Sequence, residues 1–298
     1  KTKIMTSTSY LDPSALMRVK SLELRARMVM EGFWKGLHRS PYHGFSVEFS
    51  EYRPYVRGDD PRFLDWKVMA RSDRAFIKKF EDETNLRAHI LLDRSKSMSY
   101  GSGQYTKADY SSTLAATFAY FLMGQNDAVG LTTFDQRVDQ HIPARNRPGQ
   151  LRRLMLRMEQ APSGHGTDLG AAMKGLHELI KKRSFIALIS DLLAPIEELE
   201  TQIGYLAAGG HDLAIFQTLD PREIDFDFSQ ATHYRDVETG QDLFIDPTNA
   251  RSDYLERFSA HRDAVRTMCA KHGVTHHLCS TGEPLEQVLF EFVTDRAK

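Results

Sequence analysis

The chain has 298 residues, of which 41% are hydrophobic and 27% are charged, and these fractions are typical of a folded soluble protein. Its formal net charge is −1, which excludes a general electrostatic attraction to nucleic acid or to an anionic membrane surface. Only Cys269 and Cys279 are present, too few for a disulfide framework, and no apolar run approaches the roughly 18 residues of a transmembrane helix. Length and composition together predict a cytoplasmic protein with one α/β domain and an added segment.

Residues 1–85 are expected to form that added segment, an N-terminal extension. The apolar spacing over residues 14–37 predicts an amphipathic helix. Asp60 before Pro61 predicts the cap and first turn of a second helix, which continues to about residue 70. Short strands are expected on either side of that second helix, at residues 47–49 and 75–80.

Residues 86–298 are expected to form the α/β domain. Apolar runs of strand length alternate with helical stretches, which is the pattern of βαβ units in a parallel sheet flanked by helices. A small hairpin insertion is expected at residues 232–246. The predicted strands span residues 88–93, 128–134, 185–191, 213–217 and 274–279, and the predicted helices span 107–123, 149–159, 169–182, 195–208, 251–272 and 283–294.

Two of the predicted strands end in a carboxylate, Asp93 and Asp191. In an open α/β sheet, ligands bind beyond the carboxyl ends of the strands, at the point where strand order reverses. If the two strands flank that point, both carboxylates face one crevice. Ser95 and Ser97 follow Asp93 in an Asp-x-Ser-x-Ser pattern, and such a turn can aim both hydroxyls back toward the carboxylate. Thr167, in a glycine-containing loop that opens a helix, supplies a third hydroxyl.

These oxygen-bearing side chains predict a site for Mg²⁺, with Mn²⁺ or Ca²⁺ as alternatives. Hard cations prefer oxygen ligands, and Mg²⁺ keeps near-octahedral geometry with several waters. Two carboxylates and three hydroxyls leave one coordination position open and leave the charge of the cation incompletely neutralised. An aspartate or glutamate from a partner protein would complete both. The predicted ligands are Asp93, Ser95, Ser97, Thr167 and Asp191.

The motifs around these ligands resemble a known family. Asp-Arg-Ser-Lys-Ser-Met at residues 93–98, Gly-Thr-Asp-Leu-Gly at 166–170 and Ser-Asp at 190–191 are similar to the metal-ion-dependent adhesion site of von Willebrand factor A domains. That resemblance implies a doubly wound, mostly parallel sheet flanked by helices, and it implies the same five residues as metal ligands.

The segment upstream of the domain narrows the resemblance. Tyr-Arg-Pro-Tyr at residues 52–55, Gly-Asp-Asp at 58–60 and Asp-Trp at 65–66 resemble the signature of a bacterial family known only as domain of unknown function fifty-eight. Members of that family carry an A-like domain, and their genes often neighbour those of MoxR-type AAA+ ATPases. The resemblance covers roughly residues 22–292. It implies a metal-dependent adaptor for a MoxR-type ATPase or its client, in a chaperone-like or assembly role, and it leaves the oligomeric state open.

The segment from residue 48 to residue 71 combines arginine and aspartate with aromatic side chains, and it is too rich in aromatics for a disordered linker. Arginine guanidinium groups can form bidentate hydrogen bonds with carboxylates. Two interpretations stay open: a docking surface for the partner, or a structural clasp that closes the N-terminal helix onto the sheet. We favour the clasp, because Pro54, Gly58 and Pro61 restrict the path of the backbone. The side chains assigned to this segment are Arg53, Tyr55, Asp59, Asp60, Arg62, Asp65, Trp66 and Arg71.

Two enzymatic interpretations compete with binding. Asp93 could accept a phosphoryl group beside a cation on Asp191, but haloacid-dehalogenase-like phosphatases place a second aspartate where this chain has Ser95. A metal-dependent nuclease could use the acidic residues of the 48–65 segment, yet these alternate with arginines and favour internal ion pairs. The sequence contains no P-loop, nucleophile elbow or dinucleotide fingerprint. We therefore predict a binding module without catalytic residues. The acids of the nuclease alternative are Glu48, Glu51, Asp59, Asp60 and Asp65.

Overall fold

A computed structural model of the chain describes residues 10–39, 51–54, 76–79, 86–135, 137–160, 175, 179–227, 232–235, 242–245 and 247–296. Two compact units are present, one containing residues 1–35 and 86–298 and the other containing residues 36–85. Within the smaller unit, β1 (Glu51–Pro54) pairs in antiparallel orientation with β2 (Phe76–Lys79). β2 confirms the strand predicted at residues 75–80.

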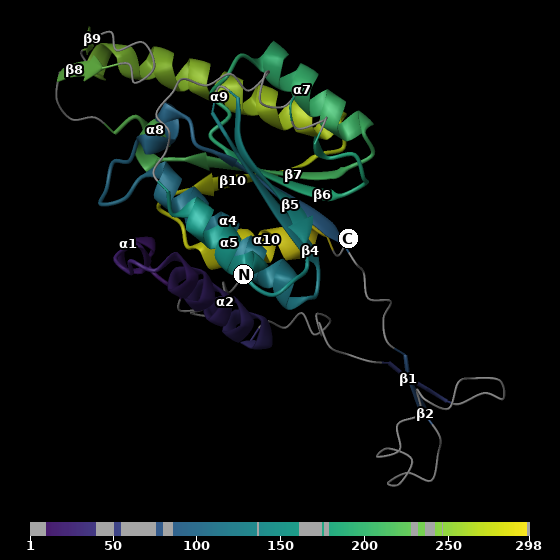
Figure 1. The fold of residues 1–298 in the computed structure, drawn as a ribbon. Helices are drawn as coiled ribbons and strands as arrows, with labels where there is room; N and C mark the ends of the chain where they lie inside the picture. The colour runs from purple at the N-terminus through teal and green to yellow at the C-terminus, as the bar shows by residue number, and fades with distance from the viewer. Residues whose placement is uncertain are drawn as a thin grey trace, which may run out of the picture. The chain divides into compact units, whose positions relative to one another are not determined.

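The larger unit is built on a six-stranded sheet with the order β10-β7-β6-β3-β4-β5 (Figure 1). Neighbouring strands are parallel throughout, except that β5 is antiparallel to β4. Because β3 lies between β4 and β6, strand order reverses around it, and its carboxyl end is a topological switch point. The strands are β3 (Arg87–Asp93), β4 (Ala128–Phe134), β5 (Val138–Arg145), β6 (Phe185–Ser190), β7 (Asp212–Leu219) and β10 (Thr275–Ser280).

Helices cover both faces of this sheet (Figure 1). One face carries α7 (Ile196–Ala208) and α9 (Pro247–Lys271). The other carries α4 (Lys107–Gly124), α5 (Gln150–Met158) and α10 (Leu285–Arg296). This arrangement confirms the predicted mixed α/β fold with a mostly parallel sheet. Among the helices of the described ranges, none combines the length and the apolar character needed to cross a bilayer.

The prediction of a single helix over residues 14–37 is wrong. The structure has two helices there, α1 (Pro13–Met17) and α2 (Leu22–Arg39). Asp12 caps α1 with its side chain. Ser21 starts the second helix, since its hydroxyl accepts a hydrogen bond from the backbone N of Leu24 at 3.3 Å. Such local hydrogen bonds by serine and aspartate favour helix starts over helix interiors.

Several expected elements cannot be compared with the structure. The strand at residues 47–49, the helix that starts at Asp60 and most of the helix at 169–182 lie outside the described residues. Near the predicted hairpin insertion, β8 (Thr232–Arg235) pairs in antiparallel orientation with β9 (Asp242–Ile245). The helix expected from residue 251 begins earlier, at Pro247.

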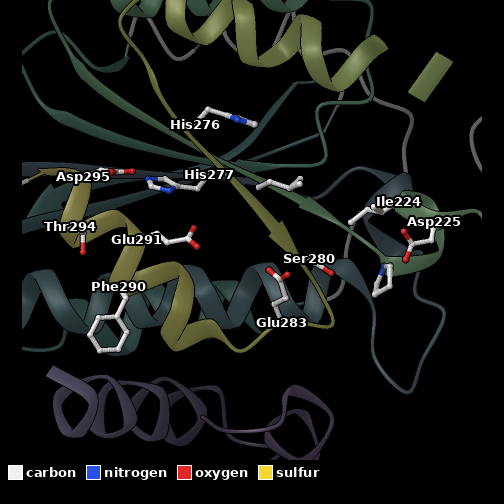
Figure 2. A pocket seen from close by; sticks show the side chains of 12 residues that line it. Ile224, Asp225, His276, His277, Ser280, Glu283, Phe290, Glu291, Thr294 and Asp295 are labelled. Carbon is white, nitrogen blue, oxygen red and sulfur yellow. The ribbon is translucent and has the colours of Figure 1, made fainter. Parts of the chain in front are cut away.

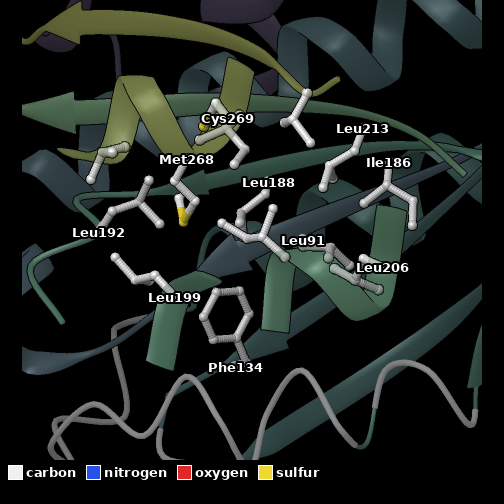
Figure 3. Packing of buried hydrophobic residues seen from close by; sticks show 14 of the residues in the cluster. Leu91, Phe134, Ile186, Leu188, Leu192, Leu199, Leu206, Leu213, Met268 and Cys269 are labelled. Carbon is white, nitrogen blue, oxygen red and sulfur yellow. The ribbon is translucent and has the colours of Figure 1, made fainter. Parts of the chain in front are cut away.

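Apolar side chains fill the space between the sheet and each helical layer. Under α7 and α9, a cluster of buried residues includes Leu91, Ile186 and Leu199 (Figure 3). On the other face, the ring of Phe118 packs against Phe216 at 4.7 Å between centroids. This packing fixes β3 and β6 side by side, and therefore fixes the carboxyl ends at which the predicted ligands lie. Both cysteines are free, and both are buried.

Candidate metal centre

Asp93 ends β3 at the switch point and is fully buried. Its Oδ1 accepts a hydrogen bond from the backbone N of Ser95 at 2.8 Å. Its Oδ2 accepts one from the hydroxyl of Ser190, at the end of the neighbouring strand β6. The orientation of the carboxylate is therefore determined by two hydrogen bonds, one from the turn that follows β3 and one from the end of β6.

Ser95 and Ser97 form the turn that follows β3. Ser95 is fully buried and precedes a short 3-10 helix, η2 (Lys96–Ser99), but its side chain makes no capping hydrogen bond to that helix. The hydroxyl oxygens of Ser95 and Ser97 lie 3.1 Å apart. With Mg²⁺–oxygen distances of about 2.0–2.1 Å, adjacent vertices of an octahedral shell are roughly 2.9 Å apart. The spacing of the two hydroxyls fits two neighbouring positions around one hard cation.

Asp191 follows β6 directly and is 2% exposed. The next residue, Leu192, has a φ of 54°, a left-handed conformation that is rare for a bulky side chain. Its backbone N donates to the Ser190 hydroxyl at 3.1 Å, and Nε2 of Gln217 donates to the carbonyl oxygen of Asp191 at 3.1 Å. These contacts hold the turn in its strained conformation, which is common where a backbone positions a functional group.

The two carboxylates influence each other. Burial, followed by the negative charge of Asp191, raises the pKa of Asp93 to about 6, while hydrogen bonds from Ser190 and Ser95 act in the opposite direction. Two buried acids at one sheet edge repel each other, and a divalent cation between them would relieve that repulsion. The donor set of carboxylate and hydroxyl oxygens is the one that hard cations prefer. The residues present therefore fit the predicted cation.

The structure brings together four of the five predicted ligands. The fifth, Thr167, lies outside the described residues. Within the described ranges, no group of three or more His, Cys, Asp or Glu side chains is placed to hold a metal ion, so this candidate centre depends on hydroxyl ligands. Of the residues assigned to the clasp or docking surface, the structure describes only Arg53, and only its backbone, which lies in β1. The others lie outside the described residues: Tyr55, Asp59, Asp60, Arg62, Asp65, Trp66 and Arg71.

Lys107 belongs to the site, although the sequence pattern assigned it only to the start of a helix. It is the first residue of α4 and is fully buried. Its Nζ lies 2.9 Å from Oδ2 of Asp191 and 2.7 Å from Oε1 of Glu223. Burial acts to lower the pKa of Lys107, but the charges of Asp191 and Glu223 outweigh it and raise that pKa above its ordinary value. The ammonium is therefore a fixed positive charge beside the candidate ligands.

A groove of about 640 Å³ begins at the turn after Asp191. Its wall includes Leu193, which is 44% exposed, and the aromatic rings of Tyr254 and Phe258. The Tyr254 hydroxyl donates to the backbone carbonyl of Glu223 at 2.9 Å, which links the groove to the residue that Lys107 contacts. Leu193 connects the groove to Asp191, because its backbone N lies 3.4 Å from Oδ1 of that residue.

A second hollow, of about 770 Å³, lies along the edge strand β10 and the helix α10 (Figure 2). Its lining includes four acids: Asp225, Glu283, Glu291 and Asp295. The strands β6 and β7 separate β10 from β3, so this hollow is not the crevice at Asp93. None of the four predicted ligands that the structure describes, Asp93, Ser95, Ser97 and Asp191, lines it.

Comparisons with known proteins point to an uncharacterised group. A family model described as "Protein of unknown function DUF58" matches residues 51–264. The uncharacterized protein Rv1480 of Mycobacterium tuberculosis is 29% identical over 264 residues, which cover 86% of this chain and 82% of that protein. The conserved hypothetical protein BatB of Bacteroides thetaiotaomicron is similar over 71% of this chain and 98% of its own, with 16% identity and a TM-score of 0.47. An aerotolerance-related membrane protein of Bacteroides fragilis is similar over 70% of this chain and 99% of its own, with 14% identity and a TM-score of 0.48.

Proposed function

The chain belongs to the family of unknown function DUF58, and from its candidate metal centre we propose that it is a metal-dependent protein-binding module. The observation that carries this proposal is the pair of buried carboxylates on neighbouring strands, with two serine hydroxyls 3.1 Å apart beside them. The site would be a metal-ion-dependent adhesion site in a von Willebrand factor A-like domain. Its ligands for Mg²⁺, or alternatively Mn²⁺ or Ca²⁺, would be Asp93, Ser95, Ser97, Thr167 and Asp191.

The partner is proposed to contribute a carboxylate. Two carboxylates and three hydroxyls fill five positions of an octahedral shell, and the open sixth position favours a further oxygen ligand. An aspartate or glutamate of the partner would take that position. The groove beside Asp191, with Leu193, Tyr254 and Phe258 in its wall, would receive an apolar side chain next to that acid. Aromatic anchors in a desolvated pocket are typical of the energetic centre of a protein interface.

We propose a MoxR-type AAA+ ATPase, or the client of that ATPase, as the partner. Ser97→Ala is expected to weaken the complex with the purified ATPase while the chain stays folded, because the substitution removes one metal ligand. Chelation of divalent cations should have the same effect on the wild-type chain. The measurement is a titration by calorimetry or fluorescence anisotropy. Ser259→Ala, an exposed serine on α9, is the matched control. Binding that ignores both Ser97→Ala and chelation would mean that the contact lies elsewhere.

Metal binding itself is expected to stabilise the chain, because the folded state gathers ligands that the unfolded chain scatters. At a free metal concentration about 100-fold above the dissociation constant, the linkage is about 2.7 kcal/mol. We therefore expect Mg²⁺ or Mn²⁺ to raise the melting temperature, and we expect Asp93→Ala combined with Asp191→Ala to abolish that rise. Asp263→Ala removes an exposed carboxylate and should leave it intact. Identical wild-type melting curves with and without metal would refute metal binding.

A further inference from the structure

We propose that Lys107 is a positioning residue that sets the charge of the metal centre, acting as an internal cation that weakens divalent-cation binding and reduces the repulsion between the loaded centre and a partner carboxylate. This inference rests on the proposed function. Its structural basis is the double contact of the ammonium, 2.9 Å from Asp191 and 2.7 Å from Glu223. The contact with Asp191 uses Oδ2, so Lys107 acts on one of the predicted ligands directly.

The position of Lys107 is costly for a lysine, which argues for a specific role. The side chain is fully buried, and removing an ammonium from water costs several kcal/mol before any pairing. It is also the first residue of α4, where the helix dipole favours negative charge. A lysine placed against both effects is retained only where nearby carboxylates compensate it. Those carboxylates are Asp191, 84 residues away in sequence, and Glu223, 116 residues away.

Both residues of the Lys107–Glu223 ion pair are held in place by backbone contacts. Glu223 is in the first turn of α8 (Pro221–Asp225), where its Oε2 accepts a hydrogen bond from the backbone N of Asp220 at 2.8 Å. Its Oε1 is thereby left to face Lys107. On the other side, the backbone N of Lys107 donates to the carbonyl oxygen of Tyr100 at 2.8 Å. The ammonium is therefore positioned by the fold and does not depend on a flexible surface side chain.

A count of formal charges shows what Lys107 changes. The cluster contains three carboxylates, of Asp93, Asp191 and Glu223, and one ammonium, of Lys107, so its formal charge is −2 when all are ionised. A divalent cation makes the loaded cluster neutral, and a partner carboxylate then adds one negative charge. Without Lys107 the loaded cluster would already carry −1, and a partner carboxylate would bring it to −2. Lys107 therefore reduces the attraction for the metal and reduces the repulsion of an incoming acid.

Calorimetric titration of the full chain with Mn²⁺ tests this role with two substitutions of opposite expected effect. Lys107→Met removes the internal cation and is expected to increase the Mn²⁺ affinity by about tenfold or more. Glu223→Gln keeps Lys107 but directs its charge onto Asp191 alone, and it is expected to decrease the Mn²⁺ affinity by about tenfold. Lys107→Arg keeps the charge and should stay close to wild type. Glu223→Gln preserves the test even where Lys107→Met fails to fold.

The control is Glu31→Gln on α2, which removes an exposed carboxylate paired with Arg27 and should leave Mn²⁺ affinity unchanged. If Lys107 had only a structural role, both Lys107→Met and Glu223→Gln would lower the Mn²⁺ affinity. If Lys107 had no influence on the metal, neither substitution would change that affinity. Either result, with Mn²⁺ still binding to the wild-type chain, would overturn this inference alone. Absence of Mn²⁺ binding to the wild-type chain would overturn the proposed function and this inference with it.

Discussion

Replacing Lys107 with methionine is expected to lower the free energy of unfolding by about 3–5 kcal/mol in buffer without divalent cations. The reason is that methionine fills a similar volume but leaves Asp191 and Glu223 without their shared counter-charge. Asp191 is 2% exposed, so water cannot solvate it in place of the ammonium. Urea unfolding in the presence of a chelator measures the loss. Lys35→Met on α2 removes an exposed lysine and should change stability by less than about 1 kcal/mol.

Saturating Mg²⁺ is expected to return part of that stability to the Lys107→Met variant. A cation that binds more tightly to the folded variant than to the folded wild-type chain stabilises it more at the same concentration. The gap between the two unfolding free energies should therefore narrow when Mg²⁺ replaces the chelator. A gap that stays constant would mean that the metal and Lys107 do not interact. A variant as stable as wild type in chelator would mean that the ion pairs contribute nothing to folding.

The strands of the sheet differ in how well the sequence predicts them. Strands β3, β6 and β7 are found where apolar runs were expected, because strands covered by helices on both faces need almost continuous apolar side chains. β5 was not predicted. It lies at the edge of the sheet, half of its sequence Val-Asp-Gln-His-Ile-Pro-Ala-Arg is polar, and Pro143 interrupts the pattern. A proline is tolerated there because an edge strand has one side without a hydrogen-bonded neighbour.

The candidate site divides in a similar way. Asp93 and Asp191 could be placed from sequence because a carboxylate that follows a buried strand in an α/β sheet faces the ligand-binding edge. The hydroxyl of Ser190 donates a hydrogen bond to Asp93, and this contact depends on the pairing of β3 with β6. The sequence pattern alone could not predict it. Lys107 was missed because it looks like an ordinary charged residue in the first turn of a helix, and Glu223 was missed because no helix was predicted around it. A lysine in a position that the helix dipole disfavours was the one available signal.

The N-terminal extension gives the other large expected effect. Arg53→Ala or Asp65→Ala is expected to lower the free energy of unfolding by about 3–5 kcal/mol, the cost of breaking a buried ion pair. The prediction follows from the alternation of arginine and acid in the sequence, since the side chains themselves lie outside the described residues. What the structure adds is that β1 and β2 pair, with Glu51 opposite Lys79, so the two ends of residues 55–75 are tied together.

Chemical unfolding measures this loss, and limited proteolysis adds a second reading, because a clasp should leave the junction at residues 79–85 uncut. Arg27→Ala is the matched control: its partner Glu31 lies 3.2 Å away, but the side chains are 63% and 55% exposed. Exposed pairs of this kind contribute at most about 1 kcal/mol. Variants of Arg53 or Asp65 that melt like the parent but no longer bind the partner would contradict the clasp. The arginine–aspartate pattern would then be a docking surface, with the partner carboxylate at the metal as only one part of a larger interface.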